Sequence, residues 1–355
     1  MEPKGTDLGS SLLVPSVQEL VKEPITKVPL RYVRLDQDPP IISQPPYSLP
    51  EVPVIDMARL SSENSADHEL EKLHLACKDW GFFQIINHEV GVSLLDKVKE
   101  ETQEFFNLPM EEKKKFWQTT DDIEGFGQAF VVSEEQKLDW ADMFYLVTLP
   151  HGIRKPHLLP NLPMPFRDTL EAYSRELKNT AIKTLLYIAK ALKMESKDMI
   201  VLFEEGMQGM RMNYYPPCPQ PEQVIGLTPH SDAVGITFLL QLNEVPGLQI
   251  RKDEIWIPIK PLPNAFIVNI GEILEIVTNG QYKSVEHRAI VNSEKERLSI
   301  ATFLSPKLDG DLGPAPSLIT PKTPPKFTRV AVADFFKNLF SRELNRKTNL
   351  EQYYV

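Results

Sequence analysis

The chain has 355 residues, 42% of them hydrophobic, and a formal net charge of −10. This acidic balance argues against nucleic acid as a partner, because no basic stripe is available to neutralise phosphates. The sequence has two cysteines, no signal peptide and no apolar run near the ~18 residues of a membrane span. These features predict a cytoplasmic protein that does not use a membrane.

The first 205 residues predict a helix-rich region that contains the first strands. Residues 1–50 are rich in proline and predict a segment that wraps a domain rather than building its core. In the charged stretch 110–142, the close glycines Gly125 and Gly127 predict a loop. Apolar periodicity predicts strands at 51–57 and 82–88 and helices at 68–80, 91–106 and 167–194.

From residue 208 the pattern changes to short apolar runs separated by proline, glycine and asparagine. Such runs are typical of antiparallel strands that form a barrel or a double-sheet roll. An amphipathic helix is predicted at 330–347. We therefore expect an α+β fold with a mainly β core, in which 1–205, a catalytic core at 206–310 and a C-terminal helical cover at 311–355 form one globular unit.

Two histidines and one aspartate are candidate metal ligands. His230 and Asp232 are two residues apart in an apolar run, so a strand would project both side chains from one face. His287 lies in a separate strand-like run that a roll could bring beside them. Burying three unpartnered polar groups costs ~1–3 kcal/mol each, and a shared metal ion satisfies all three. The set suits non-haem Fe(II) but also catalytic zinc, and His-x-Asp alone also fits an ordinary satisfied polar pair.

Four further side chains form a candidate carboxylate site. Arg297 and Ser299 share one face of a strand, and the rigid guanidinium fork is a good receptor for a carboxylate. Asn213 and Tyr215 have the same spacing on an earlier run. The Tyr215 hydroxyl could donate a hydrogen bond to the same carboxylate, and Asn213 could reach the other end of a small diacid. The alternative for Arg297 is a surface ion pair with a nearby glutamate.

Several stretches together resemble a known family. "WGFFQIINH", "LDWADMF", "MNYYPPCPQP", "PHSDAVGITFLLQ" and "VEHRAIVNSEKERLSIATF" are similar to the plant Fe(II)- and 2-oxoglutarate-dependent dioxygenases. The chain most resembles their specialised-metabolism branch, with alkaloid O-demethylases and senescence-related-gene-like proteins, from about residue 14 to its end.

The resemblance implies a double-stranded β-helix, or jelly roll, with helices packed outside it. It also implies roles for seven residues. The iron ligands would be His230, Asp232 and His287; the groups that bind the distal carboxylate of 2-oxoglutarate would be Arg297 and Ser299, assisted by Tyr215; Asn213 would approach the same co-substrate.

The implied reaction uses Fe(II), 2-oxoglutarate and O2, with ascorbate in a supporting role. An apolar or aromatic plant metabolite would be hydroxylated or O- or N-demethylated, or else desaturated or cyclised, with release of succinate and CO2. The alternatives are an iron oxidase of the same fold that does not use 2-oxoglutarate, a non-catalytic small-molecule-binding relative and a zinc hydrolase. We expect a monomer.

The substrate pocket should be apolar and aromatic. The helix predicted at 330–347 could cover its mouth or could simply pack on the barrel. Glu89 and Glu272 replace the glycine and aspartate usual in the family; the first is expected near the substrate entrance or on a solvated loop, and neither is expected to contact the metal or Arg297. The candidate pocket residues are Phe126, Phe130, Phe144, Ala233, Val234 and Phe303, and the alternative for the aromatic ones is ordinary core packing.

Overall fold

The protein is described by a computed structural model over residues 11–38, 49–119, 122–128, 131–340 and 350–355. Within these ranges no helix is both long enough and apolar enough to cross a membrane.

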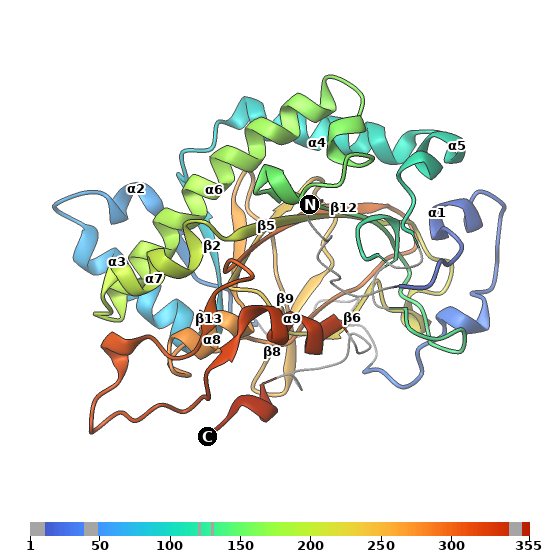
Figure 1. Ribbon diagram of the computed structural model, residues 1–355. Coiled ribbons are helices and arrows are strands. Elements are labelled where there is room, and N and C mark those ends of the chain that lie inside the picture. The colour runs from blue at the N-terminus through green and yellow to red at the C-terminus, as the bar shows by residue number, and fades with distance from the viewer. Residues whose placement is uncertain (1–10, 39–48, 120–121, 129–130, 341–349) are drawn as a thin grey trace, which may run out of the picture.

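Two β-sheets form the centre of the molecule, with the smaller sheet below the larger one in the view of Figure 1. The larger sheet runs in the order β1 (Val54–Asp56), β2 (Phe82–Ile86), β10 (Phe266–Ile270), β7 (Ile236–Gln241), β12 (Arg297–Ser305), β5 (Met207–Tyr215), β4 (Asp142–Leu149) and β3 (Gly125–Gly127). The smaller sheet runs in the order β6 (Leu227–His230), β11 (His287–Ala289), β8 (Leu248–Lys252) and β9 (Ile255–Pro258). Their pairing is antiparallel except between β1 and β2. The roll expected from the sequence is therefore confirmed as a double-stranded β-helix.

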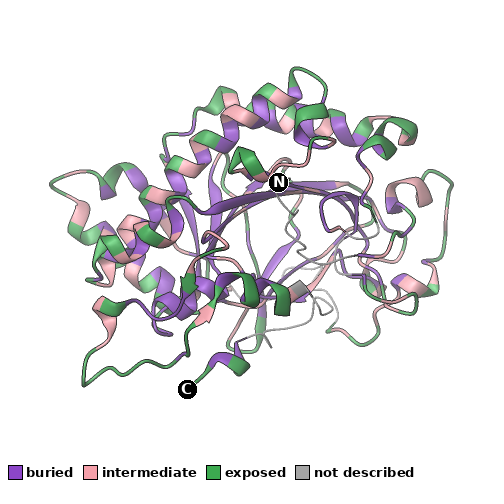
Figure 2. Ribbon diagram, viewed as in Figure 1, coloured by how far each residue is buried: buried purple, intermediate pink, exposed green. Residues whose placement is uncertain are grey.

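Helices cover the outer face of the larger sheet (Figures 1 and 2). They include the predicted long helix, and the buried apolar residues of that helix belong to the main core. Their bounds are α3 (Ala66–Leu75), α4 (Val92–Asn107), α6 (Phe166–Ala191) and α7 (Ser196–Phe203). Shorter helices are α1 (Val17–Leu20), α2 (Met57–Leu60), α5 (Met110–Lys113), α8 (Glu272–Val277) and α9 (Val332–Phe340), and a small third sheet pairs β13 (Asp311–Leu312) with β14 (Val330–Ala331).

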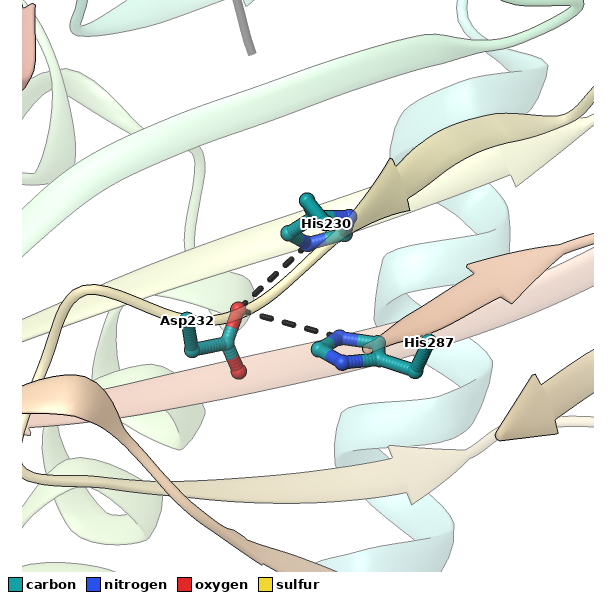
Figure 3. A group of neighbouring side chains, drawn as sticks. All are labelled: His230, Asp232 and His287. Atoms are coloured by element: carbon teal, nitrogen blue, oxygen red, sulfur yellow. Dashed lines mark ion pairs between the residues drawn. The ribbon is translucent and has the colours of Figure 1, made fainter. Parts of the chain in front are cut away.

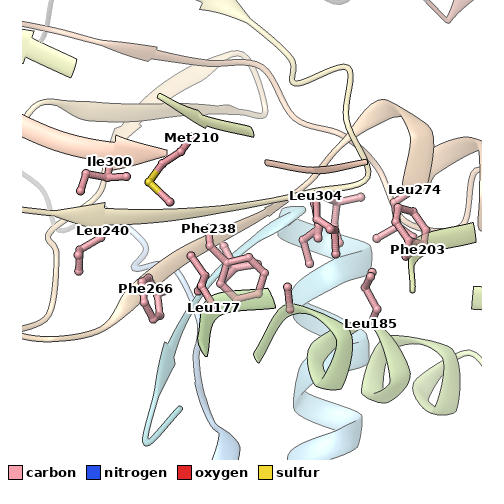
Figure 4. Packing of buried hydrophobic residues seen from close by; sticks show 14 of the residues in the cluster. Leu177, Leu185, Phe203, Met210, Phe238, Leu240, Phe266, Leu274, Ile300 and Leu304 are labelled. Carbon is pink, nitrogen blue, oxygen red and sulfur yellow. The ribbon is translucent and has the colours of Figure 1, made fainter. Parts of the chain in front are cut away.

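Strand parity divides the larger sheet into an apolar outer face and a polar inner face. Successive side chains of a strand point to opposite faces. Met210, Phe238 and Ile300 of the central strands lie in the core with Leu177 and Leu185 of α6 (Figure 4). The alternate residues of the same strands therefore face the space between the two sheets, and this fixes where a polar site can lie.

Gly125 and Gly127 belong to strand β3, so the predicted loop is wrong at this point. β3 extends the larger sheet beside β4. Gly125 has a φ of 120°, and a Cβ on it would lie 2.8 Å from the Gln118 backbone nitrogen. Gly127 has a φ of 152°, and a Cβ on it would lie 2.5 Å from Gln118 Oε1. Glycine here permits the close approach of the preceding segment, and it does not mark irregular structure.

The N-terminal segment wraps the sheets but also builds a small core, contrary to the expectation. Val17 and Tyr32 belong to a second buried cluster that includes Trp140. Asp142 accepts hydrogen bonds from the Ser16 hydroxyl at 2.6 Å and from the Val17 amide at 2.8 Å. The "LDWADMF" stretch thus anchors the N-terminal segment to the edge of the larger sheet.

Candidate active site

Three metal-ligand side chains converge between the two sheets (Figure 3). Asp232 Oδ1 lies 3.4 Å from His230 Nε2 and 3.7 Å from His287 Nε2, and the candidate ligand atoms all lie within 4.8 Å of one another. His230 ends β6 and is paired directly with His287, which begins β11. Asp232 lies just beyond the strand, so the expectation that one strand carries both His230 and Asp232 is wrong, although both side chains reach the same point.

The outer nitrogen of each imidazole fixes the direction of the inner one. His230 Nδ1 lies 2.7 Å from the Thr228 carbonyl oxygen, and His287 Nδ1 lies 3.2 Å from that of Val285. A carbonyl oxygen only accepts, so Nδ1 must donate in both cases. The lone pair of each Nε2 therefore faces Asp232, as metal-binding histidines require.

The carboxylate is held in the same way. Asp232 Oδ2 accepts hydrogen bonds from Thr237 Oγ1 at 2.6 Å and Asn269 Nδ2 at 2.8 Å, which leaves Oδ1 toward the imidazoles. Burial alone would raise the pKa of Asp232, but His287, His230 and Asn269 together hold it below its ordinary value. Burial lowers the pKa of His287 to about 4. At neutral pH the site therefore offers a carboxylate and a neutral imidazole, the forms that bind a metal ion, and the two-histidine, one-carboxylate set fits Fe(II).

A buried guanidinium without a carboxylate partner lies nearby. The Arg297 residue is 2% exposed. Its Nη1 lies 3.4 Å from Ser299 Oγ and its Nη2 3.2 Å from Gln241 Oε1, while its Nε makes no hydrogen bond. Within the described residues Arg297 forms no ion pair, so the surface-pair alternative is wrong. A buried cation with neutral partners alone is costly, and a ligand carboxylate would complete the site.

The four residues of the predicted carboxylate site form two cross-strand pairs. Arg297 of β12 lies opposite Tyr215 of β5, with its guanidinium carbon 5.1 Å from the ring centre, and Ser299 lies opposite Asn213. The buried Asn213 Oδ1 has no hydrogen-bond partner among the residues that the structure describes. The register thus brings together two sequence runs that are about 80 residues apart.

Two cavities meet at the metal-ligand cluster. The co-substrate chamber is lined by Arg297, Ser299, Tyr215, Asn213 and all three candidate ligands. The substrate chamber has an empty volume of about 810 Å³, including its part open to solvent. Residues that line both are Arg211, His230, Asp232 and Phe303.

The structure places three of the six predicted pocket residues in the substrate chamber, namely Ala233, Val234 and Phe303. Phe126 and Phe144 are corrections, because they lie on the opposite face of the sheet in the core. Phe144 stacks on Phe105 of α4 at 4.7 Å between ring centres. Phe130 lies outside the described residues.

Sequence reasoning missed several residues of the substrate chamber. Strand parity could have found Met143 and Tyr145, which flank the outward-facing Phe144, and Arg211, which has the parity of Asn213. Phe336 and Leu339 of α9 also line the chamber, but no local pattern reports where a terminal helix docks. These α9 residues form part of the wall of the pocket, as the sequence suggested.

The two acidic departures from the family pattern differ in role. Glu89 pairs with Lys183 of α6 with 63% of its side chain exposed, and it lines neither chamber, so it is a solvated loop residue. Glu272 begins α8, and its carboxylate accepts a hydrogen bond from Ser231 Oγ at 2.5 Å while its amide donates to the Asp232 carbonyl at 2.8 Å. Glu272 therefore braces the segment that carries two candidate ligands, which the sequence did not indicate.

Comparisons with known proteins agree with this geometry. Residues 206–306 match the model of the 2OG-Fe(II) oxygenase superfamily, and residues 52–162 match that of the non-haem dioxygenase in morphine synthesis N-terminal. Protein SRG1 of Arabidopsis thaliana is 58% identical over 354 residues, covering 99% of both chains. This chain belongs to the 2OG-Fe(II) oxygenase superfamily.

Other relatives of the oxygenase carry named activities. The oxoglutarate-dependent flavonoid 7-O-demethylase 1 of Ocimum basilicum is 58% identical over 97% of this chain and 92% of its own. Codeine O-demethylase of Papaver somniferum is 53% identical over 97% of each chain. The crystal structure of JOX2 in complex with 2OG, Fe and JA has a TM-score of 0.86 at 34% identity, covering 96% of this chain and 98% of JOX2. The protein is therefore an enzyme, a 2-oxoglutarate-dependent oxygenase that uses iron and acts on a small molecule.

Proposed function

We propose that the oxygenase removes an O-methyl group from an apolar aromatic plant metabolite. The observation that carries this proposal is the junction of an apolar chamber and a carboxylate-binding chamber at His230 and Asp232. An apolar methyl ether fits the first chamber and 2-oxoglutarate the second. Relatives named as O-demethylases of a flavonoid and of codeine support this choice of reaction.

In this proposal the chain's residues bind and orient. His230, Asp232 and His287 hold Fe(II), which with 2-oxoglutarate and O2 supplies the oxidation of a C–H bond when bound. Arg297 and Ser299 bind the distal carboxylate of 2-oxoglutarate, with Tyr215 against the guanidinium and Asn213 along the chain of the diacid. The apolar wall at Ala233, Val234 and Phe303 orients the methyl group and excludes water.

The products follow from atom balance. One O2 supplies one oxygen to 2-oxoglutarate, which becomes succinate and CO2, and one oxygen to the methyl carbon. The resulting hemiacetal breaks its C–O bond and gives formaldehyde and the free hydroxyl compound. A substrate whose reactive carbon is not bonded to oxygen or nitrogen would keep its new hydroxyl group, so hydroxylation is the second candidate reaction.

The test is a substrate screen with Fe(II), 2-oxoglutarate and O2. Mass spectrometry should find products that have lost a CH2 unit, in amounts equal to the formaldehyde released and to the succinate released above the substrate-free background. Products that have instead gained one oxygen would favour hydroxylation, and an enzyme that turns over without 2-oxoglutarate would overturn the proposal.

Variants of the metal cluster sharpen that test. His230→Ala, Asp232→Ala and His287→Ala should each abolish succinate release, whereas His151→Ala is the matched control because this histidine is an exposed residue outside both chambers. Activity that survives in all three cluster variants would contradict the assignment of the ligands.

We further propose that the enzyme works as a cytoplasmic monomer without nucleic acid, with ascorbate supporting turnover. The acidic composition argues against a nucleic-acid partner, and the few cysteines favour a reducing compartment. Light scattering of the full chain at working concentration should give the mass of one protomer, and a dimer mass would contradict the proposal.

A further inference from the structure

Arg211 occupies the boundary between the two chambers and lines both of them. It lies on β5 with the inward parity of Asn213, opposite Tyr145 of β4 and opposite Ala301 of β12. Arg211 thus brings a full positive charge to the edge of an otherwise apolar pocket.

Within the described residues the Arg211 guanidinium makes no hydrogen bond and no ion pair. Its Nε is buried without any partner. Asp139 lies within range of its charge, but that carboxylate accepts hydrogen bonds from the Thr228 amide and hydroxyl instead. A buried guanidinium donor without an acceptor is costly, so the site is complete only with an oxygen-bearing ligand.

Tyr145, the cross-strand partner of Arg211, adds a hydroxyl donor to the wall of the substrate chamber. Its ring lies 6.5 Å from that of Phe303, and both side chains line the substrate chamber. A Cβ on Gly209 would lie 2.5 Å from the Tyr145 hydroxyl oxygen, so only glycine lets the tyrosine cross the strand at this place. Burial and the nearby Glu124 raise the pKa of Tyr145, which keeps the hydroxyl protonated and able to donate.

We propose that Arg211 and Tyr145 form an anchor for an anionic oxygen of the substrate. The substrate class is then an aromatic methyl ether that also carries a carboxylate or an acidic phenol, bound with its apolar body against Met143, Met207 and Phe336. This inference rests on the proposed O-demethylation and adds a polar specificity element to it. The guanidinium binds the charged oxygen, and the tyrosine hydroxyl donates to the same group.

The test compares 6-methoxy-2-naphthoate with the neutral isostere 6-methoxy-2-naphthamide. Equilibrium dialysis is carried out without O2, on the full chain loaded with Fe(II) and saturating 2-oxoglutarate. The wild type should bind the carboxylate at least about tenfold more tightly than the amide, because a charge-assisted hydrogen bond to a desolvated anion is involved. Arg211→Gln should abolish this preference, Tyr145→Phe should reduce it about threefold, and Arg167→Gln, an exposed control on α6, should keep it.

Each other outcome overturns the anchor. These outcomes are no binding of the carboxylate to the wild type, equal binding of both probes, or a preference that survives in Arg211→Gln. A weaker dissociation constant for 2-oxoglutarate in Arg211→Gln, with naphthoate binding unchanged, would assign Arg211 to the co-substrate. If Arg211→Gln fails to fold, as judged by circular dichroism, Tyr145→Phe decides between the outcomes.

Failure of the anchor is separate from failure of the proposed function. Substrate-free release of succinate from 2-oxoglutarate by the wild type reports on the proposed function alone, because its measurement does not depend on the substrate anchor. An enzyme that releases succinate and demethylates neutral ethers, yet shows no preference for the naphthoate, would keep the function and lose the anchor.

Discussion

At the scale of one residue, Glu89 is a departure from the family pattern that affects the stability of the fold rather than the site. Its φ is 68°, a left-handed conformation that costs a residue with a side chain about 1 kcal/mol and costs glycine little. Its ion pair with Lys183 is exposed and is worth little in water.

We expect Glu89→Gly to raise the free energy of unfolding by about 0.5–1 kcal/mol without changing turnover. Relief of the left-handed strain should exceed the loss of the exposed ion pair. Urea denaturation of the two proteins measures the difference. Glu89→Ala is the matched control, because it loses the pair and keeps the strain; a stability gain in Glu89→Ala would refute the explanation.

Glu124 carries a pH dependence that belongs to the fold. Burial raises its pKa from an ordinary value of 4.5 to about 7, although it accepts a hydrogen bond from the Val147 amide. The folded protein therefore binds this proton more tightly than the unfolded chain does. The stabilising contribution is complete below pH 4.5 and is lost as the pH rises toward 7.

Glu124→Gln should remove that dependence. Between pH 5 and 8 the wild type should lose about 2–3 kcal/mol relative to the variant, since each pKa unit is worth about 1.4 kcal/mol. Chemical denaturation at several pH values gives both curves. Parallel curves over this range would show that Glu124 does not titrate in this way. Glu134→Gln, which changes a largely exposed carboxylate, serves as the control.

At the scale of elements, α9 closes one side of the substrate chamber. It contributes Phe336 and Leu339 to the wall, while Phe335 packs against Tyr353 in the core. The co-substrate chamber receives no residue from this helix. The two chambers share several strand residues but differ in their dependence on α9.

Phe336→Ala should raise the KM for the methoxylated substrate about tenfold, because a truncated aromatic side chain loses roughly 1.5–3 kcal/mol of burial. The KM for 2-oxoglutarate should stay within about twofold, since no α9 residue lines its chamber. Steady-state kinetics with each co-substrate varied in turn separates the two. A parallel rise in both KM values would mean that α9 supports the whole barrel.

At the scale of the whole molecule, the larger sheet and its covering helices extend beyond the segment 206–310 that carries the candidate ligands. β1, β2, β3 and β4 of the larger sheet, and α6 that covers it, all come from residues before 206. We infer that the three regions expected from the sequence fold as one unit.

A fragment of residues 206–310 should therefore not fold alone. It would expose the apolar outer face of β5, β7, β10 and β12, which α6 and its neighbours bury. Circular dichroism and urea titration should show no cooperative transition in the fragment and a single one in the full chain. A cooperative transition in the fragment would show instead that the catalytic core is an independent domain.

The sequence by itself determined the elements and the chemistry. Period 3.6 identified α6, and alternating apolar runs identified β7, β10 and β12, because these patterns are local consequences of which face is buried. Residue types at fixed spacing pointed to the three candidate metal ligands and to Arg297, since few other arrangements of histidine, aspartate and arginine suit buried strands.

Only the tertiary structure decided which side chains share a space. Strand register places Tyr145 and Arg211 side by side in the chamber and turns Phe126 and Phe144 into the core, and a shift by one residue would reverse every assignment. The docking of α9, the brace from Glu272 to Ser231 and the left-handed turn at Glu89 likewise depend on contacts between residues far apart in the chain. Such contacts leave no periodic trace in the sequence, because their partners come from different elements.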